Sequence, residues 1–236
     1  MPYHRRMYTL YQYDISPFCD KVRRVLNFKG IGYKVREVTL AETARGFLNK
    51  LGGQPKLPVL ENGSERIFDS TDICTYLEER HPDPAVYPTA PADRGLALML
   101  EDWADESLYF YEMYLRFTLP HNAKRWMPVL CEHDGRLMSG LANRIVPRAL
   151  KKKVASQGVG KKPHEHVVRD VTRHVSAVDE RLAGGDWLVG DALSIADIAV
   201  FAQLSCIAGT REGEELIAGR SRVGPWLERV DSATSR

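Results

Sequence analysis

The first eighty residues alternate between strand and helix patterns. Residues 8–13 are rich in aromatic and β-forming side chains and predict a strand. An amphipathic helix follows, because apolar side chains recur at helical spacing at Phe18, Val22, Val25 and Leu26. A second strand is predicted over residues 33–38. Two strands joined by one helix should run parallel, through a right-handed crossover.

The next stretch predicts a hairpin followed by a helix. Two apolar runs, residues 57–60 and 66–68, flank Asn62-Gly63, a dipeptide typical of tight turns, so their strands should be antiparallel. A helix is predicted from Ser70 to His81, because the following proline disfavours helical backbone in the residue before it. Residues 42–51, between the two halves, are weakly helical. This order indicates a small α/β domain.

Beyond residue 82 the pattern changes to helices alone. Prolines at positions 82, 84, 88 and 91 indicate a linker. One long helix is predicted over residues 94–117, with a stripe formed by Trp103, Phe110, Met113, Tyr114 and Phe117. Further helices are predicted over residues 167–182, 194–208 and 225–230. Residues 151–162 contain five lysines and two glycines and predict a solvated loop.

Composition narrows the class of protein without identifying it. With 44% hydrophobic and 27% charged residues, the chain has the balance of a globular protein, and 236 residues suffice for two modest domains. The net charge of +2 points to neither nucleic acid nor a membrane surface. The most apolar stretch, residues 195–208, is too short to span a bilayer. We therefore expect a cytosolic protein with no membrane or nucleic-acid partner.

The cysteines and histidines predict no metal site. The four cysteines lie far apart, so reduced thiols are expected rather than a disulfide framework. Cys131-x-His133 and His164-x-His166 could each supply two ligands, but neither has a second pair nearby in the sequence.

Ser16-Pro17 is a helix-start signature at the end of the first strand. Serine is a favoured N-cap, and proline suits the first helical position. Ser16 could serve only as that cap. A helix N-terminus beyond a strand end also favours negative charge, so a serine hydroxyl there could stabilise a bound thiolate. Cys19, in the first turn, is the alternative working thiol, although a small buried cysteine is the simpler interpretation.

Two further segments carry candidate binding groups. Pro58 begins a predicted strand, and a cis Leu57-Pro58 bond would turn the backbone of Leu57 outward toward an extended peptide. Asp69-Ser70 begins a predicted helix, where free amides and a carboxylate could hold the α-amino acid group of a ligand.

Taken in order, these segments resemble the cytosolic glutathione transferase family, in a serine-type, bacterial-like form of uncertain class. The resemblance rests on Ser16-Pro17-Phe18-Cys19, Lys56 to Leu60 and Asp69-Ser70, and it extends to Ser194-Ile195-Ala196-Asp197, which resembles the family's N-capping box, with Leu193 and Ile198 as a hydrophobic staple. It implies a thioredoxin-like α/β domain over residues 6–81, a linker over 82–91 and an all-helical domain over 92–236.

The resemblance also implies roles for particular residues. Ser16 would hydrogen-bond the sulfur of glutathione, the co-substrate, and activate it for attack on a small, largely apolar electrophile. The glutathione-binding set would be Ser16, Phe18, Lys56, Leu57, Pro58, Asp69 and Ser70. Asp69 stands where the family commonly has glutamate. The acceptor would lie near Trp103, Tyr109 or Met113, and a homodimer is expected.

Two alternatives stay open at this point. Relatives with Cys-Pro-Phe-Cys in the same loop act as thiol reductases or isomerases, and Cys19 could play such a part here, in a reductase, lyase or isomerase. Other proteins with this fold are non-catalytic binding partners.

Overall fold

The computed structural model describes residues 7–235 and begins with a four-stranded sheet and its helices. Residues 1–6, including the first residue of the predicted N-terminal domain, lie outside the described residues. The elements of this part are β1 (Tyr8–Gln12), α1 (Pro17–Phe28), β2 (Tyr33–Glu37), α2 (Leu40–Ala44), α3 (Phe47–Leu51), β3 (Val59–Asn62), β4 (Glu65–Phe68) and α4 (Ser70–Arg80).

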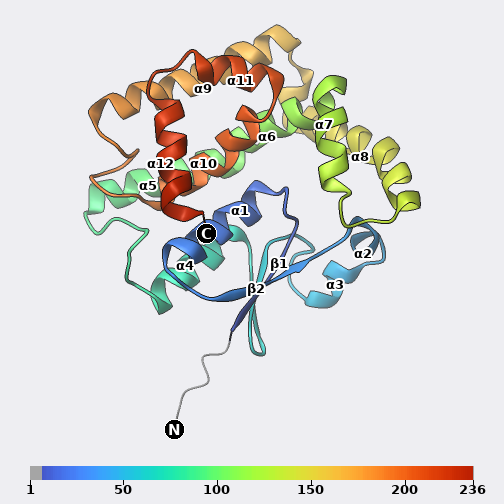
Figure 1. Ribbon diagram of the computed structural model, residues 1–236, viewed down its shortest axis with the longest axis horizontal. Coiled ribbons are helices and arrows are strands. Elements are labelled where there is room, and N and C mark those ends of the chain that lie inside the picture. Colours follow the sequence, from blue (N-terminus) through green and yellow to red (C-terminus); the bar gives the residue numbers. More distant parts are fainter. Residues whose placement is uncertain (1–6, 236) are drawn as a thin grey trace.

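The strand order is β2-β1-β3-β4, which confirms the predicted pairing directions. β1 and β2 are parallel, and Tyr8 pairs with Tyr33. β3 runs antiparallel to both β1 and β4, and Gly63 closes the hairpin with a φ of 66°, in the left-handed region that favours glycine. Helices α1 and α4 lie between the sheet and the helical part of the molecule (Figure 1).

Both faces of the sheet are covered by apolar side chains. On one side the strands and helices α1 and α4 share a core that includes Leu10, Leu60, Leu26 and Leu77, all fully buried. A smaller cluster forms around Val38, Leu48, Leu51 and Val59, beneath α2 and α3. Packing on both faces fixes the register of the strands, because a slip by one residue would move every side chain to the opposite face, where it would not fit.

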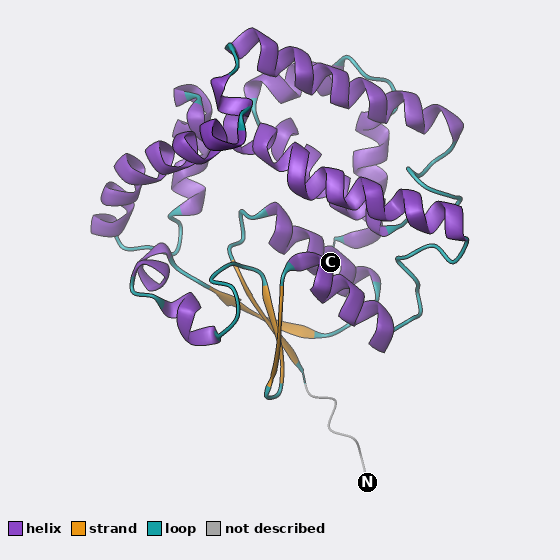
Figure 2. Cartoon of the chain, turned by 180° about the vertical axis from the view of Figure 1, so that it is seen from behind, coloured by secondary structure: helices purple, strands orange, loops and turns teal. Residues whose placement is uncertain are grey.

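The rest of the chain is helical, as predicted, and forms a layer on the far side of α1 and α4 (Figure 2). Its elements are α5 (Pro91–Trp103), the π-helical turn η1 (Ala104–Leu108), α6 (Tyr109–Met113), a second π-helical turn η2 (Tyr114–Thr118), α7 (Pro120–Leu130), α8 (Arg136–Gln157), η3 (Val159–Lys161), α9 (His164–Arg181), η4 (Leu182–Gly184), α10 (Ile195–Ala208), α11 (Arg211–Ala218) and α12 (Val223–Thr234).

One prediction about this helical part is wrong. Residues 151–162 were expected to form a solvated loop, but α8 continues through Lys151, Lys152 and Lys153 to Gln157, and η3 follows. The helix persists because Ala142, Val146, Leu150 and Val154 recur every fourth residue and are buried or packed against the core. The predicted helix over residues 94–117 is continuous but contains both π-helical turns.

Helix α10 is the centre of the helical domain and depends on the side chain of Asp197. Eleven of its 14 residues are buried. The Asp197 carboxylate is fully buried and accepts hydrogen bonds from the amides of Ser194 (3.0 Å) and Leu188 (2.8 Å) and from the indole N–H of Trp226 (3.0 Å). The predicted capping box is therefore present, and it also fixes the preceding loop and α12.

Among residues 7–235, no helix is both long enough and apolar enough to cross a membrane.

Replacing Asp197 by alanine should destabilise the whole chain. The substitution removes the acceptor for three buried N–H groups, and each buried donor left without a partner costs about 1–3 kcal/mol. We expect a loss of about 3–5 kcal/mol in the free energy of unfolding and a fall of about 10 °C in Tm, measured by thermal denaturation.

Asp191→Ala is the matched control, because Asp191 lies in the same loop region but is exposed, and its Tm should stay within about 1 °C of the wild type. An equal fall for both variants would contradict the assigned role of Asp197.

Candidate active site

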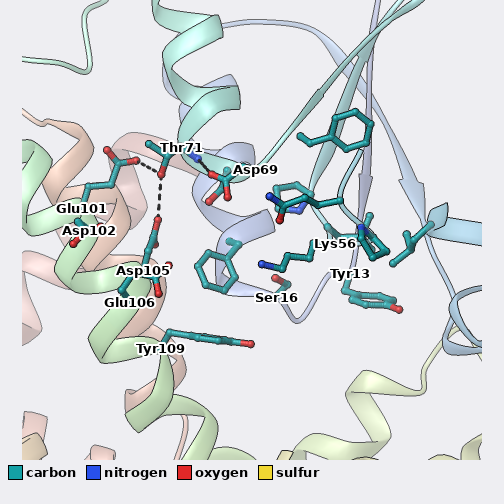
Figure 3. A pocket seen from close by; sticks show the side chains of 18 of the residues that line it. Tyr13, Ser16, Lys56, Asp69, Thr71, Glu101, Asp102, Asp105, Glu106 and Tyr109 are labelled. Carbon is teal, nitrogen blue, oxygen red and sulfur yellow. Dashed lines mark hydrogen bonds between the residues drawn. The ribbon is translucent and has the colours of Figure 1, made fainter. Parts of the chain in front are cut away.

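A cavity of about 780 Å³ lies between the α/β domain and the helical domain. One wall comes from the loop before α1, the segment before β3 and the start of α4, and the other comes from α5, η1, α6 and α8. Figure 3 shows Ser16 and Lys56 on one side, and Asp102, Glu106 and Tyr109 on the other.

Ser16 is the N-cap residue of α1 and lines the cavity. Its backbone is extended, with its amide bonded to the carbonyl of Tyr13 at 3.0 Å, and Pro17 occupies the first helical position. Its side chain makes no capping hydrogen bond to any amide of α1, a helix that is described throughout. The hydroxyl is therefore not committed to the amides of α1. It hydrogen-bonds to the thiol of Cys19 and lies at a helix N-terminus, where the helix dipole favours an anion.

Leu57 and Pro58 form the neighbouring part of the wall. The peptide bond between them is cis, Pro58 is buried, and both residues line the cavity together with the exposed Lys56. β3 begins only at Val59, so the backbone groups of Leu57 lie outside the strand. They can pair with an extended ligand backbone.

The start of α4 supplies an acidic group and a helix N-terminus. Asp69 is exposed, with a φ of 70° that is uncommon for a residue with a side chain, and its carboxylate accepts from the amide of Thr71 at 2.9 Å. Ser70 is buried but reaches the cavity. The combination suits a ligand group that carries both an amine and a carboxylate.

Beneath this wall, one buried cation joins three helices. The ammonium of Lys21, on α1, is fully buried and bonds to Glu101 (2.9 Å), Asp105 (2.5 Å) and the hydroxyl of Thr71 (3.0 Å). Burial alone would lower the pKa of Lys21, but the carboxylates of Asp105 and Glu101 outweigh it and raise the pKa above its usual range. Lys21 therefore stays charged and holds α1, α4 and the α5–η1 segment together.

A second buried cation holds the loop before Ser16. The guanidinium of Arg116, in η2, is 1% exposed and donates to Glu112 (3.0 Å) and to the carbonyl of Ile15 (3.1 Å). It also lies over the ring of Trp126, 4.2 Å from the centroid. The residue directly before Ser16 is thus fixed by the helical domain.

The opposite wall combines two aromatic rings with charged side chains. The rings of Phe18 and Tyr109 meet edge to face at 4.7 Å, and Phe110 packs against Tyr109. The Tyr109 hydroxyl accepts a hydrogen bond from the Lys153 ammonium at 3.0 Å. Burial raises the pKa of Tyr109, so the phenol keeps its proton at neutral pH. Among residues 7–235, no acceptor for that proton is found, so it can be donated to a ligand.

Eight of the residues proposed from sequence line this one cavity: Ser16, Phe18, Lys56, Leu57, Pro58, Asp69, Ser70 and Tyr109. Three others are placed elsewhere. Trp103 packs against His174 and lines a separate pocket, and Met113 is buried in the core, so neither belongs to this cavity within the described residues. Cys19 is fully buried beneath the loop.

The sequence did not indicate several groups on the far wall. Asp102, Glu106, Phe110 and Lys153 line the cavity, but no local motif marks them, because they meet only when the helices pack. Thr71 could have been found, since it directly follows Asp69-Ser70. Residues 7–235 contain no group of three or more His, Cys, Asp or Glu side chains that could hold a metal ion.

Comparison with known proteins assigns the two domains. Residues 10–85 match the sequence model described as "Glutathione S-transferase, N-terminal domain", and residues 161–229 match "Glutathione S-transferase, C-terminal domain". A stringent starvation protein A homolog of Histophilus somni is 32% identical over 104 residues, which are 42% of this chain and 49% of that protein. The chain thus spans about half the length of that curated relative.

Solved structures cover nearly the whole chain. A glutathione S-transferase from Rhodospirillum rubrum F11 has a TM-score of 0.65 at 26% identity and covers 96% of this chain and 88% of its own. The beta-etherase LigF from Sphingobium sp. strain SYK-6 has a TM-score of 0.69 and covers 96% of this chain and 95% of its own. At 22% identity, this match shows similarity of the fold alone.

Cys19 should be inert toward alkylation in the folded protein. Burial raises the pKa of its thiol to about 11, even though hydrogen bonds from Ser16 and the backbone oppose the rise. At pH 8 about a thousandth of such a thiol is ionised, against about a quarter of a free cysteine. Iodoacetamide at pH 8, followed by peptide mass spectrometry, should leave Cys19 unlabelled in the native protein and label it fully in denaturant.

Cys131 and Cys206 serve as internal references, because the pKa of each thiol is also raised by burial. Rapid labelling of Cys19 alone in the native state would contradict this expectation and favour a redox role for the thiol.

Proposed function

Since the chain belongs to the glutathione S-transferase family, we propose that it is a glutathione-dependent transferase in which Ser16 activates the thiol. The observation that carries the proposal is the placement of Ser16. Its hydroxyl, unused as a cap within α1, lines the same cavity as Leu57, Asp69 and Ser70.

Glutathione would lie extended along the wall formed by the α/β domain. The backbone of Leu57 would pair with the cysteinyl unit, and Asp69 with Ser70 would bind the γ-glutamyl end through the carboxylate and the N-terminal amides of α4. Lys56, exposed at the rim, would meet the glycyl carboxylate. These contacts would bring the sulfur near the start of α1.

Ser16 would then stabilise the thiolate of glutathione. A hydroxyl that donates a hydrogen bond to the charged form lowers the pKa of the thiol, and the N-terminus of the 12-residue helix α1 acts in the same direction. The thiolate attacks an electrophilic carbon of the acceptor, forming a carbon–sulfur bond as a leaving group departs or a double bond is saturated.

The acceptor would occupy the space beside Tyr109, Phe110 and Leu98, opposite Ser16. These three side chains form an apolar strip beside the charged groups of the same wall, and the strip suits a small electrophile with an aromatic or aliphatic body. The Tyr109 proton, which has no acceptor among residues 7–235, would be donated to an acceptor oxygen on which negative charge develops, such as the carbonyl oxygen conjugated to an attacked double bond.

Two copies are expected to pair. Helix α5 leaves Met99 and Leu96 exposed, at 71% and 37%, on a helix whose other side packs on α10. Covering such side chains is the usual reason for association between subunits.

Replacing Ser16 by alanine should slow catalysis far more than it weakens glutathione binding. The hydroxyl acts on the thiolate, so kcat should fall about 100-fold, while the Kd for glutathione, measured by calorimetry, should change by less than about threefold. The pH–rate profile should move to higher pH, because the bound thiol loses a hydrogen bond to its charged form.

Ser64→Ala, in the exposed hairpin turn, is the matched control and should leave both quantities unchanged. An unchanged kcat in Ser16→Ala would refute the assignment of Ser16. Absence of any glutathione binding to the wild-type chain would refute the transferase itself and favour a non-catalytic binding protein.

Replacing Tyr109 by phenylalanine should affect some acceptors and not others. The ring and its contact with Phe18 remain, and only the hydroxyl is lost. For an α,β-unsaturated carbonyl acceptor, kcat/KM should fall about tenfold, which corresponds to one hydrogen bond of about 1.4 kcal/mol. A benzyl halide, from which the thiolate displaces the halide directly and which carries no oxygen, should react as with the wild type. Equal losses for both acceptors would show a packing role only.

A further inference from the structure

The outer face of α8 combines apolar and cationic side chains. It consists of Leu137, Leu141, Arg144, Ile145, Arg148 and Lys152, all exposed, which fall within about 100° of arc on a helix of 3.6 residues per turn. Leu137 is 94% exposed, and Leu141 and Ile145 are more than half exposed. The helix lies at the edge of the molecule beside α7 (Figure 1). Its opposite face carries the side chains that pack against the core, such as Ala142 and Val154.

This part of the chain is locally basic despite the small overall charge. Residues 135–164 contain eight lysines and arginines and no aspartate or glutamate. The net charge of the whole chain is only +2, because acidic residues elsewhere in the chain balance this local excess of positive charge. The outer face of α8 therefore presents apolar surface within a field that attracts anions.

Two features narrow the class of partner. A second copy is a poor occupant, because a symmetric contact through this face would bring Arg144, Arg148 and Lys152 of two copies together. The apolar side chains also project from the helix instead of lining a groove, as the 94% exposure of Leu137 shows. A projecting aliphatic side chain is best buried in a fluid apolar layer, which adapts to its shape.

We propose that the outer face of α8 binds the surface of an anionic lipid bilayer. The helix would lie in the plane of the interface, with Leu137, Leu141 and Ile145 below the level of the phosphates. The long side chains of Arg144, Arg148 and Lys152 would extend their charged ends to the headgroups while their methylene stems stay in apolar surroundings. Such binding is peripheral and involves no membrane-spanning segment.

The test is co-sedimentation of the full chain with vesicles. The protein should co-sediment with vesicles of phosphatidylcholine that contain about 30% phosphatidylglycerol, and it should stay in the supernatant with vesicles of pure phosphatidylcholine. Binding should weaken at about 0.5 M salt, because the attraction of the cations is screened. The double variant Arg148→Glu/Lys152→Glu should bind at least tenfold more weakly, and Leu137→Gln/Leu141→Gln should bind about tenfold more weakly.

Matched controls lie elsewhere on the surface. Lys34→Glu/Arg211→Glu changes the net charge by the same amount at exposed sites on β2 and α11, and Val35→Gln removes an exposed apolar side chain from β2. Both should bind like the wild type. None of these residues lines the cavity within residues 7–235, so transferase activity without vesicles should be unchanged in every variant.

Three results would overturn the proposal. The first is a failure of the wild type to sediment with phosphatidylglycerol vesicles. The second is equal loss of binding in the α8 variants and the controls, which would reflect net charge alone. The third is retention on immobilised poly-glutamate without vesicle binding, which would assign the face to an acidic protein partner.

Discussion

The architecture of the cavity depends on the buried ammonium of Lys21. It bonds to Thr71, Glu101 and Asp105, which belong to α4, α5 and η1. A single charge therefore joins α1 both to α4, in the same wall of the cavity, and to α5 and η1, in the opposite wall. Removing a charge from such a group leaves its partners buried and uncompensated, which is costly in a low-dielectric interior. The two domains are therefore fixed relative to each other where a ligand would lie between them.

The π-helical turns explain how the helical domain supplies these contacts. Asp105 lies in η1 and Arg116 in η2, and each reaches the neighbourhood of α1, one through Lys21 and the other through the carbonyl of Ile15. A π turn inserts a residue into a helix and rotates the next helical turn, so side chains can face a site that a regular helix would turn away. Arg116 thus holds the loop before Ser16 directly, and Asp105 holds α1 through Lys21.

The same turns mark the limit of sequence-based prediction. Ser16-Pro17, Leu57-Pro58 and Asp69-Ser70 were found because helix caps and proline positions are local signals, and the structure brings Ser16, Leu57, Pro58, Asp69 and Ser70 to one cavity. Trp103 and Met113 were expected near the acceptor from the family resemblance, and both belong to a stripe of regular helical period, which η1 interrupts after Trp103. No helix was predicted over α7 or α8; in α8 the outward leucines and the lysine run obscure the four-residue spacing of the buried face.

Two thiols are candidates for the nucleophile at the start of α1: the thiol of Cys19 and the thiol of a ligand beside Ser16. Both would lie in the field of the same helix dipole, so their difference in burial decides between them. That field contributes roughly 0.3–1 kcal/mol, less than one pKa unit. For Cys19 the loss of hydration is larger and raises the pKa to about 11, so its proximity to the dipole does not make it a nucleophile. A thiol brought into the cavity by a ligand avoids that desolvation and still meets the dipole and the Ser16 hydroxyl. The fold therefore favours a thiol that arrives with the substrate over one that belongs to the chain.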